Sequence, residues 1–385
     1  MAAKCGKDDL NVSNKITELH SFTIEWLLES LRNNDETFKQ FHGGKCVTEV
    51  TSELVSEGKG FLSHVYRCKI IFDDTQDVGS YSTVIKIPFL NESDMNEERE
   101  DNMPSLTEVH KWECVFYNNF AKILRIPLPK VYKTVEWIIG KEEGCIHMED
   151  LTLKGKSISF FNTINLSQVK CFIRHLARWH KNILCAQNWR GKYLKNATMR
   201  GNFIKGDDES VDGFLKHCKR KELIELVKKY RKFSVNQDFI HYINVEAHKD
   251  LNLASVIVHG DITSNNILWA IDSEGEIQNE IAGIIDWQVM HEGSPMSDLT
   301  SFLSLCCDGV VRRQAEKFAI QFYFDCLVKE FGSSGFIFQA LNEPNEALKE
   351  SFYNFGILKS LHAWEDVDRL LQEKYKYIFE KYQNL

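Results

Sequence analysis

Three oxygen-bearing side chains follow short apolar runs in the second half of the chain. Asp261 and Asn266 lie five residues apart in VIVHGDITSNNILW (residues 256–269), and Asp286 follows the apolar residues of GIIDW. Carboxylate and amide oxygens are the ligands that hard divalent cations such as Mg²⁺ prefer, and a positioned carboxylate can accept a proton. Asp and Asn are also favoured in ordinary turns, because their side chains bond the nearby backbone. These positions alone leave both interpretations open.

The first half of the chain carries a second group of candidates. Lys86 ends the strand-like run STVIKIP, and Glu113 follows 27 residues later on a predicted helix. In SEGKGFLSHVYRC, Gly58 and Gly60 allow a tight turn with free amide groups on its inner side, and Ser63 follows that turn. Each feature has an ordinary alternative: a solvent-facing strand end, a surface helix charge and a hairpin turn, respectively.

The predicted secondary structure changes character near residue 150. Before it, hydrophobic periodicity and turn residues predict a helix at 15–34, three strands within 46–90, an acidic loop at 91–104, a helix at 105–124 that opens with Ser105 and Glu108, and two strands within 128–151. After it the pattern is mainly helical, including 167–184 and the segments from 298 to the C-terminus, with one β interruption at 256–287. We therefore predict an α+β fold with a β-rich first domain, 1–150, and a helical second domain, 151–385.

The order of these motifs resembles that of kinases. HGD with an asparagine five residues after the aspartate, and a later aspartate beyond a hairpin, match kinase catalytic and metal-binding loops. More closely, VHGDITSNNILW, IIDWQVMHEGSPMSDL, MEDL and LARWH resemble the ecdysteroid-kinase-like (CHK-kinase-like) family, in the branch of the aminoglycoside phosphotransferases and choline kinases. The resemblance covers about residues 45 to 365. It implies a bilobal protein-kinase-like fold, with a small β-rich N-terminal lobe and a larger helical C-terminal lobe, and ATP-dependent phosphorylation of a small-molecule hydroxyl.

The resemblance also assigns roles to the residues. It implies that Asp261 is the catalytic base, that Asn266 and Asp286 bind Mg²⁺, and that Lys86 contacts the ATP phosphates while paired with Glu113. The nucleotide would further contact Gly58, Gly60, Ser63 and the segment Met148, Glu149, Asp150 and Leu151, which resembles the adenine-binding hinge. His259 and Asp298 would support the catalytic loop, and Asp298 could equally be a helix N-cap.

The chain departs from the kinase patterns at three places. HGD replaces the HRD of protein kinases, and IDW replaces their DFG, so regulation by a flip of that motif is not expected. Ile262 and Thr263 stand where the family often has Leu-Trp, which puts its usual substrate pocket in doubt. Several rivals remain: a pseudokinase that binds without turnover, a choline or aminoglycoside type of kinase, and a protein kinase. The protein kinase is disfavoured because Asp298 follows only twelve positions after Asp286, which leaves too few residues for a peptide-docking segment.

Composition limits the partners. The net charge of −8 gives no overall basic footprint for nucleic acid, and the basic run 216–232 is predicted to be a solvated amphipathic helix. No apolar run is long enough to span a bilayer, and residues 1–20 lack a secretory h-region, so we expect a cytoplasmic protein, assumed to be a monomer. Eleven cysteines without a CxxC pair suit reduced thiols.

The acceptor is expected to be a small-molecule hydroxyl, possible classes being steroids, other lipid-like alcohols and xenobiotics. Residues 185–250 and the helices after 340 are predicted to line its site. Aromatic residues there could form apolar walls, although ordinary core packing is the better interpretation for most of them: Trp189, Phe203, Phe214, Phe239, Tyr242 and Trp364.

Overall fold

The computed structural model describes residues 14–55, 62–73, 79–89, 106–159, 162–193, 208–234 and 236–332, together with positions 349 and 351. The chain divides into two compact units. The first comprises Met1–Glu98, Ser105–Asn118 and Pro129–Leu153, and the second comprises Arg99–Pro104, Asn119–Leu128 and Lys154–Leu385. Strands dominate the first unit and helices the second, so the predicted α+β class is confirmed.

The first unit is built on an antiparallel five-stranded sheet with the strand order β1-β2-β3-β5-β4. Its strands are β1 (Val47–Leu54), β2 (Ser63–Phe72), β3 (Ser80–Pro88), β4 (Val131–Val135) and β5 (Cys145–Glu149). The strands predicted within 46–90 and 128–151 are therefore confirmed. Along β2 the buried residues alternate, because successive side chains of a strand point to opposite faces. These buried residues are Tyr66, Cys68, Ile70 and Phe72.

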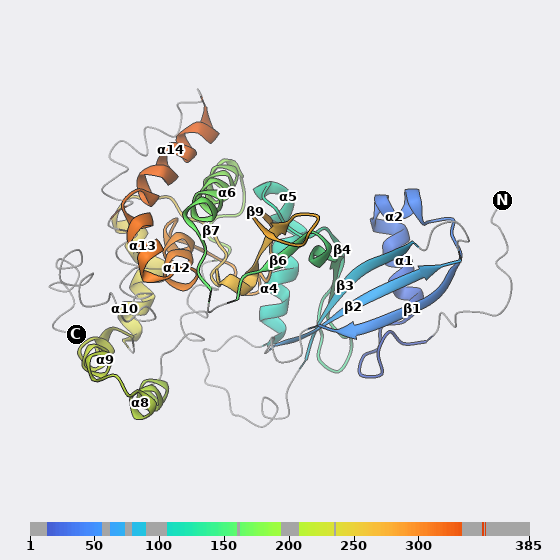
Figure 1. Cartoon of the computed structure of the whole chain (residues 1–385), viewed down its shortest axis with the longest axis horizontal. Coiled ribbons are helices and arrows are strands. Elements are labelled where there is room, and N and C mark those ends of the chain that lie inside the picture. The colour runs from blue at the N-terminus through green and yellow to red at the C-terminus, as the bar shows by residue number, and fades with distance from the viewer. Residues whose placement is uncertain are drawn as a thin grey trace. The chain divides into compact units, whose positions relative to one another are not determined.

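Two helices, α1 (Ile24–Asn34) and α2 (Glu36–Phe41), pack on this sheet (Figure 1). Leu27, Leu31 and Phe38 join the buried strand residues in one apolar cluster. The helix predicted for 15–34 is wrong in its first part, because the helix begins only at Ile24. The side chain of Thr23 caps it by accepting the backbone N–H of Trp26 at 3.2 Å, and an isolated bridge between Lys15 and Thr23 folds the preceding segment back.

The helix α4 (Leu106–Asn119) presents the apolar stripe that the sequence predicts. Val109, Trp112 and Phe116 are all buried, as is Phe120 just beyond the helix end. Glu113 lies beside this stripe and is itself buried. The proposed N-cap Ser105, the acidic segment 91–104 and the glycine turn with Gly58 and Gly60 lie outside the described residues.

Helix α6 (Leu166–Cys185) runs through the second unit and confirms the helix predicted for 167–184. Asn165 caps it reciprocally: its side chain accepts the N–H of Gln168 at 3.0 Å, and the Gln168 side chain accepts the N–H of Asn165 at 2.9 Å. Phe172 of this helix stacks on Phe302 with ring centroids 3.9 Å apart. The other helices with described bounds in this unit are α5 (Ala121–Leu124), α8 (Asp208–His217), α9 (Lys221–Ser234), α10 (Gln237–His241), α11 (Ala247–Asp250), α12 (Ser297–Leu305), α13 (Gly309–Glu316) and α14 (Ala319–Phe331).

The predicted β interruption consists of two small sheets rather than one. β7 (Val256–Val258) pairs with β10 (His291–Gly293), whereas β8 (Ile267–Ile271) lies between β6 (Gly155–Ser157) and β9 (Ile277–Ile284). The loop that carries Asp261 and Asn266 therefore leaves one sheet and enters another. A short 3₁₀ turn, η3 (Ser264–Asn266), lies within that loop, another, η1 (Leu151–Leu153), follows β5, and a π-helical turn, η2 (Tyr242–Glu246), follows α10.

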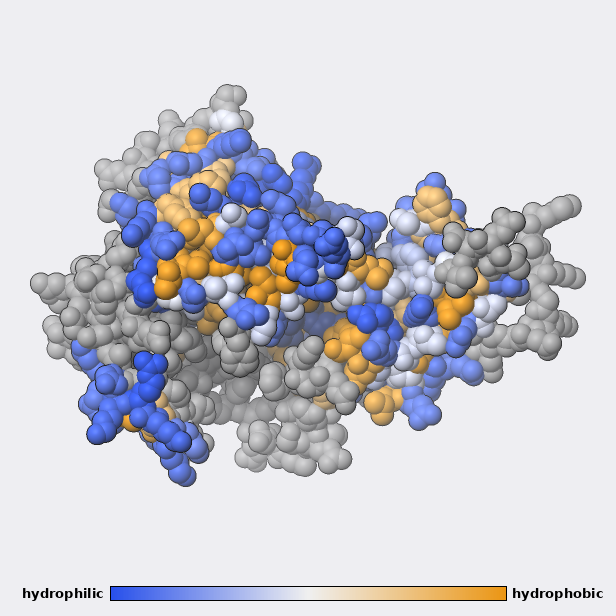
Figure 2. Space-filling model, in the orientation of Figure 1, coloured by the Kyte–Doolittle hydropathy of each residue, from blue (hydrophilic) through white to orange (hydrophobic). Residues whose placement is uncertain are grey.

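The basic run 216–232 spans the end of α8 and most of α9. Val227 is buried while Lys221, Lys228 and Lys232 are exposed, and the described side chains over α9 are mostly hydrophilic on the face that Figure 2 displays. The run is therefore not one helix, because residues 218–220 separate α8 from α9, but the described positions of α9 have the buried and exposed sides of an amphipathic helix. Within the described ranges, no helix combines the length and the apolar character that crossing a membrane requires.

The expectation that the thiols are reduced is wrong at one position. Cys46 is disulfide-bonded, whereas the cysteines of the helical cores and of β2 and β5, such as Cys68 and Cys145, are free thiols. An odd count and the absence of a CxxC pair do not exclude a disulfide, so these two features could not predict the state of Cys46.

Candidate active site

In the first unit, Lys86 and Glu113 form an ion pair. Lys86 lies on β3, opposite Val65 of β2 and Ile146 of β5. Its Nζ lies 2.6 Å from Oε2 of Glu113 on α4, and the two side chains are only 12% and 2% exposed. Opposite charges attract more strongly in such a water-poor setting than at the surface. The solvent-facing alternatives for both residues are therefore wrong.

The segment expected to bind adenine is tied into the first unit by its own hydrogen bonds. The carbonyl oxygen of Met148 accepts the hydroxyl of Thr83 at 2.8 Å. The backbone N–H of Glu149 donates to the carbonyl of Lys130 at 2.8 Å, and its carboxylate accepts the N–H of Lys130 at 3.2 Å. Leu151 is buried at the start of the η1 turn. These bonds fix the end of β5 in place.

Asp150 is buried and engaged by side chains of neighbouring elements. It accepts the Nε–H of Arg67 at 3.1 Å, the Ser82 hydroxyl at 2.5 Å and the N–H of Thr152 at 3.0 Å. Burial alone raises the pKa of Asp150, but the hydrogen bonds of Ser82 and Thr152 and the charge of Arg67 outweigh it, so the pKa lies below its ordinary value. The carboxylate thus joins β2, β3 and the η1 turn. Ser63, the first residue of β2, is half-buried and lies opposite Pro88.

In the second unit, the side chain of Asn266 is hydrogen-bonded to Asp261 of the same loop. Its amide nitrogen donates to the Asp261 carbonyl at 2.9 Å and to the Asp261 carboxylate at 3.1 Å. Since these two bonds use both hydrogens of the amide, the other amide atom, Oδ1, is the one suited to a cation. The amide orientation therefore fits the predicted metal-ligand role of Asn266.

Ile285, the residue before Asp286, is hydrogen-bonded to two residues of the loop that carries Asp261 and Asn266. Its N–H donates to the carbonyl of Asn266 at 3.0 Å, and its carbonyl accepts Nε2–H of His259 at 2.9 Å. These bonds bring the backbone at Asp286 beside the loop of Asp261 and Asn266. Asp286 itself has φ +68°, a left-handed conformation that only a few per cent of non-glycine residues adopt, although aspartate and asparagine adopt it more often than most. Such strained backbone clusters at functional sites.

His259 organises the loop in one defined protonation pattern. Because Nε2 faces the Ile285 carbonyl it must donate, and because Nδ1 receives the N–H of Asp261 at 3.1 Å it must accept. Only the neutral imidazole with its proton on Nε2 makes both bonds. Both ring nitrogens are thus occupied by the backbone, which fits a supporting role.

Asp298 holds the start of the same loop. Its two carboxylate oxygens accept the backbone N–H groups of His259 at 2.8 Å and Gly260 at 3.0 Å. Gly260 has φ +89°, which glycine adopts without steric cost. The N-cap position of α12 is Met296, so Asp298 lies in the first helical turn and the N-cap alternative is wrong.

An aromatic cluster that the sequence patterns did not indicate fixes these loops to α6. Trp287, fully buried, contacts Trp179 with ring centroids 4.8 Å apart and His259 with centroids 4.5 Å apart. Trp179 Nε1 donates to the carbonyl of Ile257 on β7 at 2.8 Å. The motifs LARWH and IIDW contain Trp179 and Trp287, but neither motif indicates that the two rings are in contact.

Two of the proposed aromatic acceptor walls belong to the core. Trp189 is 4% exposed and donates to the carbonyl of Ile183 at 3.0 Å, and Phe239 is fully buried. Tyr242 is half-buried and donates to Asp250 at 2.9 Å. Phe203, the Phe214 side chain and Trp364 lie outside the described residues.

The chain belongs to the ecdysteroid kinase-like family, whose model matches residues 57–336. A curated Caenorhabditis elegans protein named "Uncharacterized oxidoreductase dhs-27" is 26% identical over 331 residues, which cover 80% of this chain but 38% of that protein. The chain thus spans well under half the length of this relative, and the oxidoreductase name belongs to that longer protein.

Two solved structures are similar to the chain at low identity. One is a Plasmodium vivax ethanolamine kinase, 13% identical, with a TM-score of 0.44 and coverage of 84% of this chain and 78% of that one. The other is the ADP-bound aminoglycoside phosphotransferase APH(2'')-Ib, 15% identical, with a TM-score of 0.37 and coverage of 88% and 95%. At such scores this is a general likeness, and the family assignment comes from the sequence match.

Proposed function

We propose that this protein is a Mg²⁺-dependent kinase that transfers the γ-phosphoryl group of ATP to a hydroxyl group of a small molecule. The observation that carries the proposal is the bonding of Asn266 to Asp261 in the loop held by Asp298. It is supported by the buried ion pair of Lys86 and Glu113 and by membership of a kinase-like family.

In this proposal Asp261 acts on the acceptor. Its carboxylate accepts the hydroxyl proton while the acceptor oxygen forms a bond to the γ-phosphorus. The bond from that phosphorus to the β,γ-bridging oxygen breaks, and ADP leaves with the bonding electrons. Asn266 Nδ2, bonded to the Asp261 carboxylate at 3.1 Å, keeps this base in one orientation.

Asn266 Oδ1 and the Asp286 carboxylate would hold the magnesium ion. Both supply the hard oxygen ligands that Mg²⁺ requires, and the hydrogen bonds of the Asn266 nitrogen leave its oxygen suited to a cation. When bound, the ion neutralises charge that develops on the phosphates. The left-handed backbone of Asp286 sets the direction of its side chain.

Lys86, oriented by Glu113, would contact the ATP phosphates. The glycine turn with Gly58 and Gly60, followed by Ser63, would cover those phosphates, and the backbone at residues 148–151 would bind adenine. We accordingly assign nucleotide binding mainly to residues 1–150, and catalysis and acceptor binding to residues 151–385. A steroid alcohol is the acceptor class that the family description favours, and another lipid-like or xenobiotic alcohol is the alternative.

Incubation with γ-labelled ATP, Mg²⁺ and fractions of a metabolite extract tests the proposal. We expect a labelled small molecule, and we expect Asp261→Asn to lower its rate of formation by about 100-fold or more, as for the loss of a positioned base. Asp325→Asn, on the exposed face of α14 and outside the segments predicted to line the acceptor site, is the matched carboxylate control and should retain the wild-type rate.

The same experiment separates the rivals. Nucleotide binding without any Asp261-dependent product would favour the pseudokinase. Label found in protein, with none in any metabolite fraction, would favour a protein kinase. Formation of product at an unchanged rate without divalent cations would overturn the Mg²⁺ assignment.

A further inference from the structure

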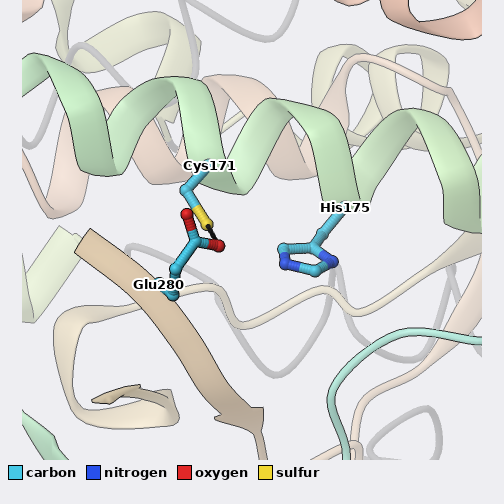
Figure 3. Close-up of side chains that lie close together, drawn as sticks. All are labelled: Cys171, His175 and Glu280. Carbon is cyan, nitrogen blue, oxygen red and sulfur yellow. Dashed lines mark hydrogen bonds between the residues drawn. The ribbon is translucent and has the colours of Figure 1, made fainter. Parts of the chain in front are cut away.

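Three side chains of ligand type meet in the second unit, at residues to which the proposed kinase reaction gives no role. Cys171 and His175 project from α6 and Glu280 projects from β9, and one ligand atom of each lies within 4.8 Å of the other two (Figure 3). Cys171 is buried, His175 half-buried and Glu280 exposed. The group is thus open to solvent on one side and closed by the protein on the other.

The helix and the strand that carry these residues are held in register. Cys171 and His175 are four residues apart and so share one face of α6. Just before Glu280, the side chain of Gln168 donates to the carbonyl of Gln278 at 3.2 Å, and Asn165 donates to Asn279 at 2.9 Å. These bonds make the spacing of the three side chains a property of the fold.

The donor set of thiol, imidazole and carboxylate matches the ligands of Zn²⁺. In a tetrahedral zinc site, bonds of about 2.0–2.3 Å place neighbouring ligand atoms about 3.5 Å apart. The Cys171 thiol already lies 3.2 Å from a Glu280 oxygen, to which it donates. The remaining ligand atoms lie up to 4.8 Å apart, and a change of conformation of the exposed Glu280 side chain can shorten its distance to the others.

His175 presents one ring nitrogen toward Cys171 and Glu280, and its other nitrogen lies on the far side of the ring (Figure 3). Burial, followed by the charge of Arg178, lowers the pKa of His175 to about 4, so its imidazole is neutral near pH 7 and retains a lone pair for a metal.

The surrounding charges are mixed. Arg174 lies 3.5 Å from Glu280 and Arg178 lies 3.1 Å from Glu330, so each arginine has a carboxylate partner.

Burial and the hydrogen bond to Glu280 raise the pKa of Cys171 to about 11. A bound metal would therefore have to displace the thiol proton, and binding should release it and strengthen with rising pH.

We propose that Cys171, His175 and Glu280 bind one Zn²⁺ ion, with water as the fourth ligand. The ion would replace the proton that Cys171 shares with Glu280 and would link α6 directly to β9. Three protein ligands are fewer than the four of closed structural zinc sites, so the fold does not depend on the ion, which adds stability when present.

Titration of the chelator-treated full chain tests this site without reference to kinase activity. Competition with a chromophoric chelator should give one Zn²⁺ per chain, and Co²⁺ should give a thiolate-to-cobalt absorption band. Cys171→Ser should abolish that band, and His175→Gln and Glu280→Gln should each weaken Zn²⁺ binding by about tenfold or more. Zn²⁺ should raise the melting temperature of the wild type by more than that of any of the three ligand variants.

Cys185→Ser is the matched control, because Cys185 is an exposed thiol at the end of the same helix. It should bind Zn²⁺ like the wild type. If Cys171→Ser does not fold, Glu280→Gln decides, since its side chain is 68% exposed and its replacement leaves the core intact. Wild-type affinity in Glu280→Gln and His175→Gln, binding lost in Cys185→Ser, or no stoichiometric binding would each overturn the proposal.

Discussion

The carboxylate of Asp298 binds the backbone N–H of His259 at 2.8 Å and thereby fixes the first residue of the HGD motif. Its second oxygen takes the N–H of Gly260 at 3.0 Å. A neutral amide cannot replace it, because an amide has one oxygen acceptor and its nitrogen would face an N–H group.

Asp298→Asn should therefore lower the free energy of unfolding by about 1–3 kcal/mol, the usual cost of a buried donor without an acceptor. Urea denaturation measures this change. Asp308→Asn is the control: Asp308 caps α13 by accepting the N–H of Val311 at 2.8 Å, and Asn caps helices as well as Asp. Equal stability of the two variants would contradict the role given to Asp298.

The ion pair of Lys86 and Glu113 predicts non-additive effects. Removing one partner leaves the other in a buried site without it, so Lys86→Met and Glu113→Gln should each cost about 3–5 kcal/mol of stability. The double variant should lose less than the sum of the two, with a coupling of about 0.5–3 kcal/mol. Chemical denaturation of all four proteins measures the cycle, and strictly additive losses would refute the coupling.

Trp287 should be a structural anchor rather than a movable switch. Its indole is fully buried and donates to the carbonyl of Ile284 at 3.2 Å. Trp287→Ala should cost about 3–5 kcal/mol, as large-to-small core changes do, while Trp287→Phe keeps an aromatic ring against Trp179 and should cost less. Thermal unfolding with both variants tests this order, and a tolerated alanine would point to a mobile side chain instead.

Buried histidines predict a loss of stability in acid. His147 is fully buried between the hydroxyls of Ser30 at 2.7 Å and Thr83 at 2.9 Å. Burial, followed by the charge of Lys133, lowers its pKa from 6.5 to about 3. Below pH 6.5 this histidine is therefore protonated in the unfolded chain but stays neutral in the folded chain, so the free energy of unfolding falls as the pH falls toward 3.

Between pH 7 and pH 5 this residue alone should remove about 2 kcal/mol from the free energy of unfolding. Urea unfolding at both pH values should show a smaller difference for His147→Gln than for the wild type. The exposed His241 gives the control variant His241→Gln. A pH dependence unchanged in His147→Gln would show that other groups cause the acid sensitivity.

Local patterning predicted the regular elements well and the long-range contacts poorly. The alternating residues of β2 and the apolar stripe of α4 were evident, because their periods are properties of short segments. By contrast, β6 and β10 are three residues long, too short to show a period, and their partners lie far along the chain.

The site residues divide in the same way. The spacing of Asp261 and Asn266 within one loop is local, and the structure joins their side chains. The engagement of Asp150 by Arg67 depends on a residue 83 positions away, which no local pattern encodes. The link of Trp179 to β7 across 78 positions is of the same kind.

Lys86 lies on the middle strand of the five-stranded sheet, with β2 and β5 bonded on its two sides. Opening of the backbone at this residue must break two hydrogen-bond ladders at once, whereas the edge strands β1 and β4 can fray by breaking one. Amide protons near Lys86 should accordingly exchange with solvent among the slowest of the first unit. The Lys86 side chain is thus attached to the strand that stays hydrogen-bonded while the edge strands of the sheet open and close.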